Sequence, residues 1–337
     1  ALPISYASFG DSSVSEGYVY EAVSGAAREL LPVIFVIQNN GYGISVPNIE
    51  QSANKNVGDN FAGFKSVKII KVDGTNVFDC WKGMQEAINY VKSGDGPAVI
   101  DANCVRMNSH SNSDRHELYR TAEEISDAQR YDPVARLRNY LISKNILSED
   151  KIVKIETENA RELEEAAANV EMEPEPDPST AGLHVIPPAY DSPQEDEPNP
   201  ESETATETLR EAINETLKEE FRRNPNTFLW GQDVASKEKG GVFNVTKGMQ
   251  QEFGQRRVFN APIAEDFIVG TANGFSRYRD DIWVCIEGAQ FADYLWPAME
   301  QVLELSHEYY RTAGQFAPNI VMRLASGGYI GGGLYHS

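Results

Sequence analysis

The feature that most constrains the fold is the alternation of short apolar segments with helix-like segments over residues 1–147. The apolar runs are typical of buried strands, and the segments between them have helical periodicity. Strands are expected at 4–9, 32–37, 67–72 and 97–105, and helices at 16–30 and 77–92. Strands that alternate with helices form a mostly parallel α/β sheet, whose ligand site should lie at the carboxyl ends of the strands.

A second unit of the same style is expected after a linker. Helical segments at 132–147 and 148–170 are followed by residues 171–207, which hold eleven Asp and Glu, no Lys or Arg, and eight of the 17 prolines. Such a segment buries too little apolar surface to fold by itself. We therefore expect an α-type domain at 1–170, an acidic Pro-rich linker at 171–207 and a second α/β domain at 208–337. The elements expected in the second domain are helices at 208–223, 246–252 and 296–310, and strands at 227–230, 282–286 and 320–324.

Composition excludes several classes of partner. The formal net charge of −21 argues against nucleic acid or an anionic membrane as the main partner. No apolar run is long enough to span a membrane. Cys80, Cys104 and Cys285 are too far apart in sequence for a disulfide framework or a cysteine zinc site, which favours a reducing cytoplasm. The chain starts at Ala1 and ends in a glycine-rich segment, so we expect a fragment shortened at both ends.

The first polar constellation joins two predicted strand ends. Asp11 follows the first strand and opens a helix, and Asn40 lies 29 positions later, after the second strand. A strand–helix–strand crossover of about this length places two strand ends side by side. Carboxylate and amide oxygens suit Mg²⁺, and helix amino ends suit phosphate. Taken singly, Asp11 could be a helix cap and Asn39-Asn40-Gly41 a simple turn.

The stretch from Gly10 to Asn40 resembles the thiamine diphosphate motif, Gly-Asp-Gly followed some thirty residues later by Asn-Asn. The surrounding SVSEG and QNNGYGISVP resemble α-subunits of 2-oxo acid dehydrogenase complexes, especially the branched-chain type. The resemblance implies that Asp11, Asn40 and the Tyr42 carbonyl hold Mg²⁺, and that Ser12 and Ser13 lie at the diphosphate. Ser12 replaces the second Gly of the motif. Because positive φ costs Ser more than Gly, this departure bears on cofactor affinity.

A second polar loop follows the strand at 97–105. Its sequence is RMNSHSNSD, from Arg106 to Asp114. A His among small hydroxyl residues and near an Arg suits anion contact or proton transfer, although a solvated polar loop would have the same composition. The loop resembles the His-Ser-x-Ser-Asp loop of the family, which implies that His110 meets the cofactor and takes part in catalysis. Ser111 matches a position that is phosphorylated in some relatives.

The third constellation lies in the second domain. Glu265 stands among apolar neighbours in PIAEDF, where a carboxyl can share a proton with a ligand nitrogen or can simply begin a helix. LWGQDV, RVFNAPIAEDFIVGTANG and QFADYLWPAMEQ resemble β-subunits of the same complexes, in order. The resemblance implies that Glu265 bonds the aminopyrimidine ring and that Tyr294 packs on it. Gln232 stands where many relatives have Glu.

The glycine-rich segment at the end of the chain carries the last candidate. Gly331-Gly332-Gly333 precede His336, which could reach a pocket or could belong to a flexible turn. The β-type resemblance implies that His336 is catalytic. The three remaining histidines have no such match and are interpreted as structural or exposed: His116, His184 and His307.

Taken together, the resemblance implies oxidative decarboxylation of a 2-oxo acid by thiamine diphosphate with Mg²⁺. Branched-chain 2-oxo acids are favoured as substrate, and a pyruvate or acetoin dehydrogenase component is the alternative. The acyl group would pass to the lipoyl arm of a partner acyltransferase. In this family the cofactor binds between an α-type and a β-type domain, usually from different copies, so a homo-oligomer is expected.

Two other functions remain open from the sequence. A transketolase-like ligase would use the same cofactor but would transfer a two-carbon unit without acylating lipoamide. An inactive scaffold with the same fold is the alternative outside enzymology, and Ser12 and the shortened ends favour it. Binding of thiamine diphosphate and Mg²⁺ would separate the scaffold from the enzymes.

Overall fold

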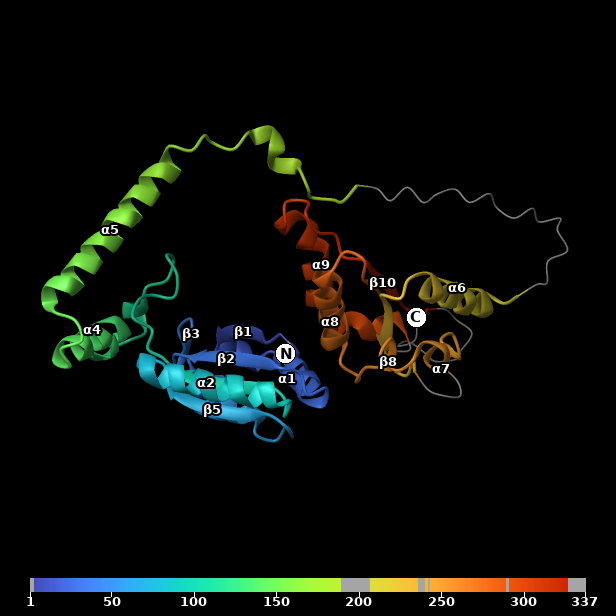
Figure 1. The fold of residues 1–337 in the computed structure, drawn as a ribbon, viewed down its shortest axis with the longest axis horizontal. Coiled ribbons are helices and arrows are strands. Elements are labelled where there is room, and N and C mark those ends of the chain that lie inside the picture. The colour runs from blue at the N-terminus through green and yellow to red at the C-terminus, as the bar shows by residue number, and fades with distance from the viewer. Residues whose placement is uncertain (1–2, 189–206, 236–239, 242, 289–290, 327–337) are drawn as a thin grey trace. The chain divides into compact units, whose positions relative to one another are not determined.

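A computed structural model describes residues 3–188, 207–235, 240–241, 243–288 and 291–326 (Figure 1). The chain divides into two compact units, Ala1–Glu175 and Pro176–Ser337. We describe each unit by itself. His336 lies outside the described residues.

The first unit is built on a parallel sheet with strand order β1-β2-β6-β5. Its strands are β1 (Ser5–Gly10), β2 (Val33–Asn39), β5 (Lys68–Asp73) and β6 (Ala98–Asn103). Gly10 pairs with Gln38, and Asn39 pairs with Asn103, so the strands end at one edge. The expected parallel α/β fold is confirmed for this unit.

Helices cover both faces of this sheet. Alternate side chains of a strand point to opposite faces. Phe35 and Ile37 of β2 join the core made with α1 (Gly17–Arg28), whereas Ile34 joins the core made with α2 (Val77–Ser93). Figure 1 shows α2 running along the sheet. The central strands β2 and β6 are covered on both faces and form largely apolar runs, which is why they were visible in the sequence.

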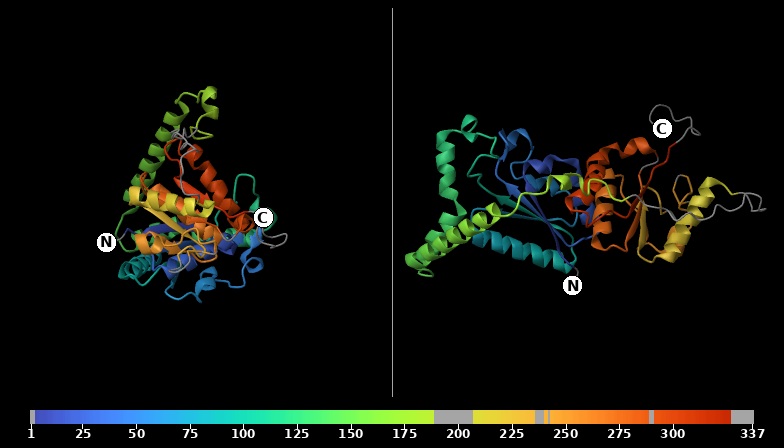
Figure 2. Two further views of the ribbon diagram at one scale, coloured as in Figure 1. Left: turned by 90° about the vertical axis from the view of Figure 1, so that its right-hand side faces the viewer. Right: turned by 90° about the horizontal axis from the view of Figure 1, so that it is seen from above.

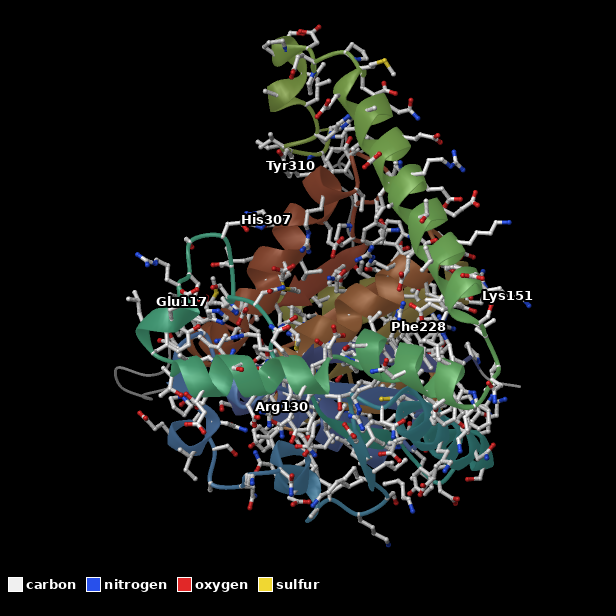
Figure 3. The ribbon with its side chains drawn as sticks, turned by 90° about the vertical axis from the view of Figure 1, so that its left-hand side faces the viewer. Glu117, Arg130, Lys151, Phe228, His307 and Tyr310 are labelled. Atoms are coloured by element: carbon white, nitrogen blue, oxygen red, sulfur yellow. The ribbon has the colours of Figure 1, made fainter. Side chains whose placement is uncertain are left out.

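The rest of the first unit consists of short elements and three further helices. A two-stranded hairpin, β3 (Tyr42–Gly43) and β4 (Val46–Pro47), follows β2. Helix α5 (Glu149–Glu171) is almost wholly exposed, with only Ile152 buried, and Lys151 points outward from it in Figure 3. The remaining elements are α3 (Ala122–Ala128), α4 (Pro133–Ser143) and the 3-10 turns η1 (Ser12–Ser15), η2 (Asn48–Glu50), η3 (Val57–Phe61), η4 (His116–Leu118) and η5 (Gln129–Tyr131).

The second unit has a parallel sheet of its own, with order β10-β9-β7-β8, seen from two further sides in Figure 2. Its strands are β7 (Thr227–Gly231), β8 (Val258–Asn260), β9 (Trp283–Glu287) and β10 (Ile320–Arg323). Its helices are α6 (Leu209–Arg223), α7 (Met249–Phe253), α8 (Glu265–Tyr278) and α9 (Met299–Arg311), with the 3-10 turns η6 (Pro178–Gly182) and η7 (Ala292–Ala298).

The core of the second unit follows the same alternation. Trp230 and Ile286 pack with α8 and α9, whereas Leu229 and Cys285 pack with α6 and α7. Burial raises the pKa of the Cys285 thiol to about 12, so this cysteine behaves as a small apolar side chain. The expected α/β fold of this unit is therefore also confirmed.

Four elements of the second unit differ from the sequence prediction: α8 and β8 were not predicted, and two predicted helices begin later than expected. The helix expected at 296–310 begins only at Met299, because Pro297 falls in the preceding 3-10 turn η7. The helix expected at 246–252 begins at Met249, after Gly248 in a left-handed conformation. Among the described residues, no helix combines the length and apolar character needed to cross a membrane.

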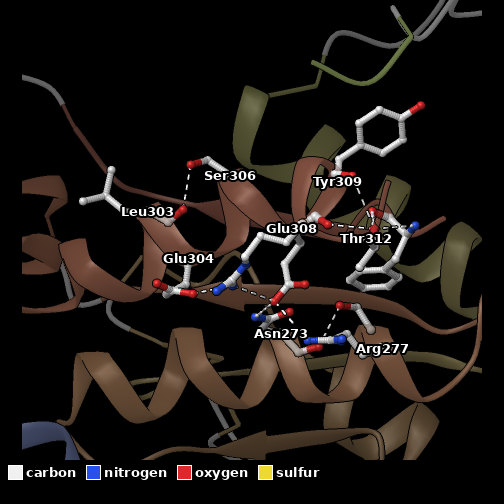
Figure 4. Close-up of polar contacts among 11 residues, drawn as sticks. Asn273, Arg277, Leu303, Glu304, Ser306, Glu308, Tyr309 and Thr312 are labelled. Atoms are coloured by element: carbon white, nitrogen blue, oxygen red, sulfur yellow. Dashed lines mark hydrogen bonds and ion pairs between the residues drawn. The ribbon is translucent and has the colours of Figure 1, made fainter. Parts of the chain in front are cut away.

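A buried carboxylate joins α8 to α9 (Figure 4). Glu308 is 2% exposed, and its Oε1 accepts hydrogen bonds from Arg277 at 3.1 Å, Arg311 at 3.2 Å and Asn273 at 3.2 Å. Because α8 begins with Glu265, this contact helps to hold the helix that carries the predicted catalytic acid.

We expect Glu308→Ala to lower the free energy of unfolding by about 1–2 kcal/mol, because two arginines and an amide lose their buried acceptor. The loss is limited because the arginine side chains are 52% and 48% exposed and can be hydrated. Urea denaturation measures it. Glu304→Ala, which removes an exposed partner of Arg311, is the matched control and should cost less. Equal losses in the two variants would contradict this role of Glu308.

Candidate active site

Asp11 lies at the carboxyl edge of the first sheet, directly after β1. Its side chain is 2% exposed, and Oδ2 accepts a hydrogen bond from the backbone N–H of Gly41 at 2.9 Å. Gly10 pairs with Gln38, so Asp11 and Asn39-Asn40 leave neighbouring parallel strands at the same level. The structure therefore brings the Asp11 carboxylate to the turn that contains Asn40 and Tyr42.

The electrostatics at Asp11 suit a cation. Burial raises the pKa of Asp11, and the negative charge of Asp101 acts in the same direction, whereas the backbone N–H of Gly41 opposes them. A bound cation would favour the ionised carboxylate. The Asn40 side-chain oxygen accepts the Tyr42 N–H at 3.1 Å and has a second lone pair for a ligand bond. These oxygen donors fit the preference of Mg²⁺.

Ser12 adopts no strained backbone where the family motif has Gly. The described non-glycine residues with positive φ do not include Ser12, which begins the 3-10 turn η1 together with Ser13. Its hydroxyl is buried and has no hydrogen-bond partner. A Cβ on Gly43 would lie 2.2 Å from that oxygen, so the close approach needs glycine there. A buried hydroxyl without a partner fits a site that binds a polar group such as a phosphate.

A buried polar network lies beneath this edge of the sheet. Asp101 of β6 is fully buried, and it accepts hydrogen bonds from the Asn39 side chain at 3.2 Å and from the Gly58 N–H at 3.0 Å. Asn39 in turn accepts one from Asn48 at 3.4 Å. Sequence reasoning missed these residues. The available signal was an Asp inside the apolar run 97–105, since a buried charge needs partners.

The loop after β6 is fastened by a chain of hydrogen bonds. Arg106 donates to the Ile44 carbonyl at 2.7 Å and to the Tyr119 hydroxyl at 2.6 Å, and Tyr119 donates to Asp114 at 2.6 Å. Asp114 also accepts the backbone N–H of His110 at 2.8 Å. These bonds hold the pKa of Asp114 low, with Tyr119 the largest cause. Thus the loop that carries His110 is tied to the β3–β4 hairpin.

His110 is exposed and helps to line a pocket of about 650 Å³. The other lining residues include His116, Glu117 and the neighbours of His110 within 107–112. Ser111 shares a hydrogen bond of 3.1 Å with Ser113. Next to this loop, the ring of Tyr42 lies 5.4 Å from the Arg106 guanidinium carbon and 5.7 Å from that of Arg120. The loop and the Asp11 edge thus share Tyr42, and the cationic side chains around it suit an anionic ligand.

Glu265 is the first residue of α8 in the second unit. It is 9% exposed, and its Oε1 accepts a hydrogen bond from the Gln232 side-chain amide at 2.8 Å. Gln232 directly follows β7, so the carboxyl stands at the carboxyl edge of this sheet. Beside it, Glu287 and Arg323 at the ends of β9 and β10 form an ion pair. Gln232 was noted in the sequence only as a departure and not as a site residue.

The remaining predicted site residues are Tyr294 and His336, and two of the histidines without a predicted role can also be placed. Tyr294 lies in η7 and is 42% exposed, and His336 lies outside the described residues. His116 is buried, and its Nδ1 lies 3.4 Å from a guanidinium nitrogen of Arg120. The His184 ring packs against Tyr309, with centroids 5.8 Å apart.

Two family models match the chain, one in each unit. The model for the dehydrogenase E1 component matches residues 3–179, and the model for the pyrimidine binding domain of transketolase matches residues 206–337. The order of the two matches agrees with the order of the α-type and β-type motifs in the sequence.

Curated relatives match about half of the chain. The pyruvate dehydrogenase E1 component subunit alpha, somatic form, mitochondrial, of Homo sapiens is 30% identical over 178 residues, which are 52% of this chain and 45% of that protein. The pyruvate dehydrogenase E1 component subunit alpha of Mycoplasma pneumoniae is 38% identical over 155 residues, 44% of this chain and 42% of that protein. The chain thus spans somewhat less than half the length of these relatives. Because the first model covers more than half of the chain, the chain belongs to the dehydrogenase E1 component family.

Proposed function

We propose that this protein decarboxylates a 2-oxo acid with thiamine diphosphate and Mg²⁺, as the E1 component of a 2-oxo acid dehydrogenase. The observation that carries the proposal is the buried Asp11 carboxylate, which is hydrogen-bonded to the Asn40–Tyr42 turn at the carboxyl edge of a parallel sheet. The family match to both units supports it.

The first unit offers groups for the diphosphate and its metal. Asp11, the Asn40 side-chain oxygen and the Tyr42 carbonyl would bind Mg²⁺. Ser12 and Ser13, at the start of η1, would offer hydrogen bonds to phosphate oxygens, and the unpaired Ser12 hydroxyl is the clearest donor. His110, on the loop tied to Asp114, would contact the diphosphate and the substrate.

The second unit offers a carboxyl for the pyrimidine ring. When bound, thiamine diphosphate supplies the carbon nucleophile and the electron sink for decarboxylation. Glu265 would hold a proton at a ring nitrogen, and its low exposure keeps water from competing for that hydrogen bond. Tyr294 would pack on the ring, and His336 would bind the oxo acid and move protons.

A substrate and partners are part of the proposal. Branched-chain 2-oxo acids are favoured by the ISVP and NSHSNSD segments, whereas the curated relatives are named as pyruvate dehydrogenases. Pyruvate is therefore the second candidate. A lipoyl-bearing acyltransferase would accept the acyl group, and we propose a cytoplasmic homo-oligomer.

A substrate panel tests this proposal. The protein is supplied with thiamine diphosphate and Mg²⁺, and reduction of an artificial electron acceptor is followed with 3-methyl-2-oxobutanoate and with pyruvate. We expect reduction with 2-oxo acids and a higher kcat/KM for the branched acid. A higher kcat/KM for pyruvate would move the assignment to the pyruvate type. Reduction with neither acid, or two-carbon transfer between sugar phosphates instead, would contradict the proposal.

A further inference from the structure

Gln232 stands out because its side chain meets Glu265 directly. We propose that Gln232 is a positioning residue, which fixes one carboxylate oxygen of Glu265 as a hydrogen-bond acceptor. The amide donates to Oε1 at 2.8 Å, which leaves Oε2 for the ligand proton. That a ligand proton meets Oε2 rests on the proposed function, whereas the contact between Gln232 and Glu265 does not.

The backbone holds the two side chains in a fixed relation. The Gly231 carbonyl accepts the Ala261 N–H at 2.8 Å, which ties the residue before Gln232 to the segment that leads into Glu265. On the other side, Gly231 pairs with Glu287 of β9, and a Cβ on Gly231 would lie 2.3 Å from the Glu287 carbonyl oxygen. The residue before Gln232 is therefore anchored to Ala261 on one side and to Glu287 on the other.

The chemistry of an amide at this place differs from that of an acid. An amide N–H that donates to a carboxylate favours the ionised form, and the amide itself does not titrate. A second carboxyl at hydrogen-bond distance would share one proton with Glu265, and the pair would then titrate together with one strongly raised pKa. A carboxyl in place of the Gln232 amide would therefore couple to Glu265, whereas the amide only donates a hydrogen bond.

The charged groups on α8 and on its neighbouring elements stay constant in the test. They lie on α8 itself, after β7, and on the elements packed against α8, namely β9, β10, η7 and α9. They are Asp266, Arg277, Asp233, Glu287, Arg323, Asp293, Glu300, Glu304, His307, Glu308 and Arg311.

The test compares the pH dependence of unfolding without cofactor in the wild type and in Gln232→Glu. In the variant, the shared proton is held with a folded-state pKa above the unfolded value. The folded state then binds more protons than the unfolded state, and stability relative to the wild type falls as pH rises from 4 to 8. We expect the ratio of folded to unfolded variant, relative to the wild type, to be at least about tenfold lower at pH 8 than at pH 4.

Two further variants keep the result interpretable. Gln255→Glu adds the same charge at an exposed position, and should leave the pH dependence of stability unchanged. The double variant Gln232→Glu/Glu265→Gln again pairs one acid with one amide, but the acid is now at position 232 and the amide at position 265. We expect the double variant to regain the wild-type pH dependence of stability but not the turnover.

The outcomes separate this inference from the proposed function. If Gln232→Glu matches Gln255→Glu in its pH dependence, or if the double variant fails to restore the wild-type behaviour, the contact does not couple the two residues and the inference is wrong. If the coupling is present but the wild type binds no thiamine diphosphate, the positioning of Glu265 stands and the proposed function fails.

Discussion

Glu265→Gln is expected to lower the turnover of 2-oxo acids by about 10²–10⁴-fold, the usual contribution of a positioned acid or base. The amide keeps the size of the side chain and can still pair with Gln232, but it has no titratable proton for a ring nitrogen. The fold should survive, since only one oxygen is replaced. The measurement is kcat with saturating cofactor and substrate, together with the melting temperature of each protein.

Glu300→Gln is the matched control for this prediction. Glu300 also stands in the first turn of a helix, α9, but is exposed. Its replacement should leave kcat unchanged. A Glu265→Gln protein that turns over at nearly the wild-type rate would remove Glu265 from the proposed chemistry.

Asp11→Asn is expected to weaken the binding of thiamine diphosphate at fixed Mg²⁺ by at least about 100-fold. Loss of residues that only support a metal ligand already costs 10–100-fold in affinity, and Asp11 is proposed as a direct ligand. An amide oxygen can still accept the Gly41 N–H, so the local turn should persist. The dissociation constant of thiamine diphosphate, measured by fluorescence titration, reports the change.

The free energy of unfolding, measured without cofactor, distinguishes a binding role of Asp11 from a structural role. Burial raises the pKa of Asp11, so its contribution to stability without cofactor is present at low pH and declines as pH rises through the folded-state pKa. Asp11→Asn removes this decline and should be at least as stable as the wild type at pH 7 when no cofactor is present. Asp95→Asn, at an exposed position, is the control. A clear loss of stability in Asp11→Asn would make Asp11 structural.

The strand ends of the first sheet were predictable because β2 and β6 are largely buried, and because β1, although more exposed, is followed directly by Asp11. Buried strands appear as uninterrupted apolar runs, and the polar residue that follows each run marks the carboxyl edge. Asp11 and Asn40 could be located in this way, and the register of β1 and β2 confirms that their strands are neighbours.

Other parts were not predicted. Helix α8 contains Gly270, Asn273 and Gly274, which are weak helix formers, and it packs against η7, β9 and α9. The contact between Asn39 and Asp101 joins residues 62 positions apart, and the contact between Gln232 and Glu265 joins residues 33 apart. Pairs like these depend on tertiary packing, which sequence spacing does not reveal.

The most direct test of the account is calorimetric titration of the wild-type protein with thiamine diphosphate, once with Mg²⁺ and once with a chelator. The account predicts saturable heat with Mg²⁺ and little or none with the chelator, because Asp11 and the Asn40–Tyr42 turn would hold the diphosphate through the metal. No heat with Mg²⁺, or equal binding in the chelator, would contradict it.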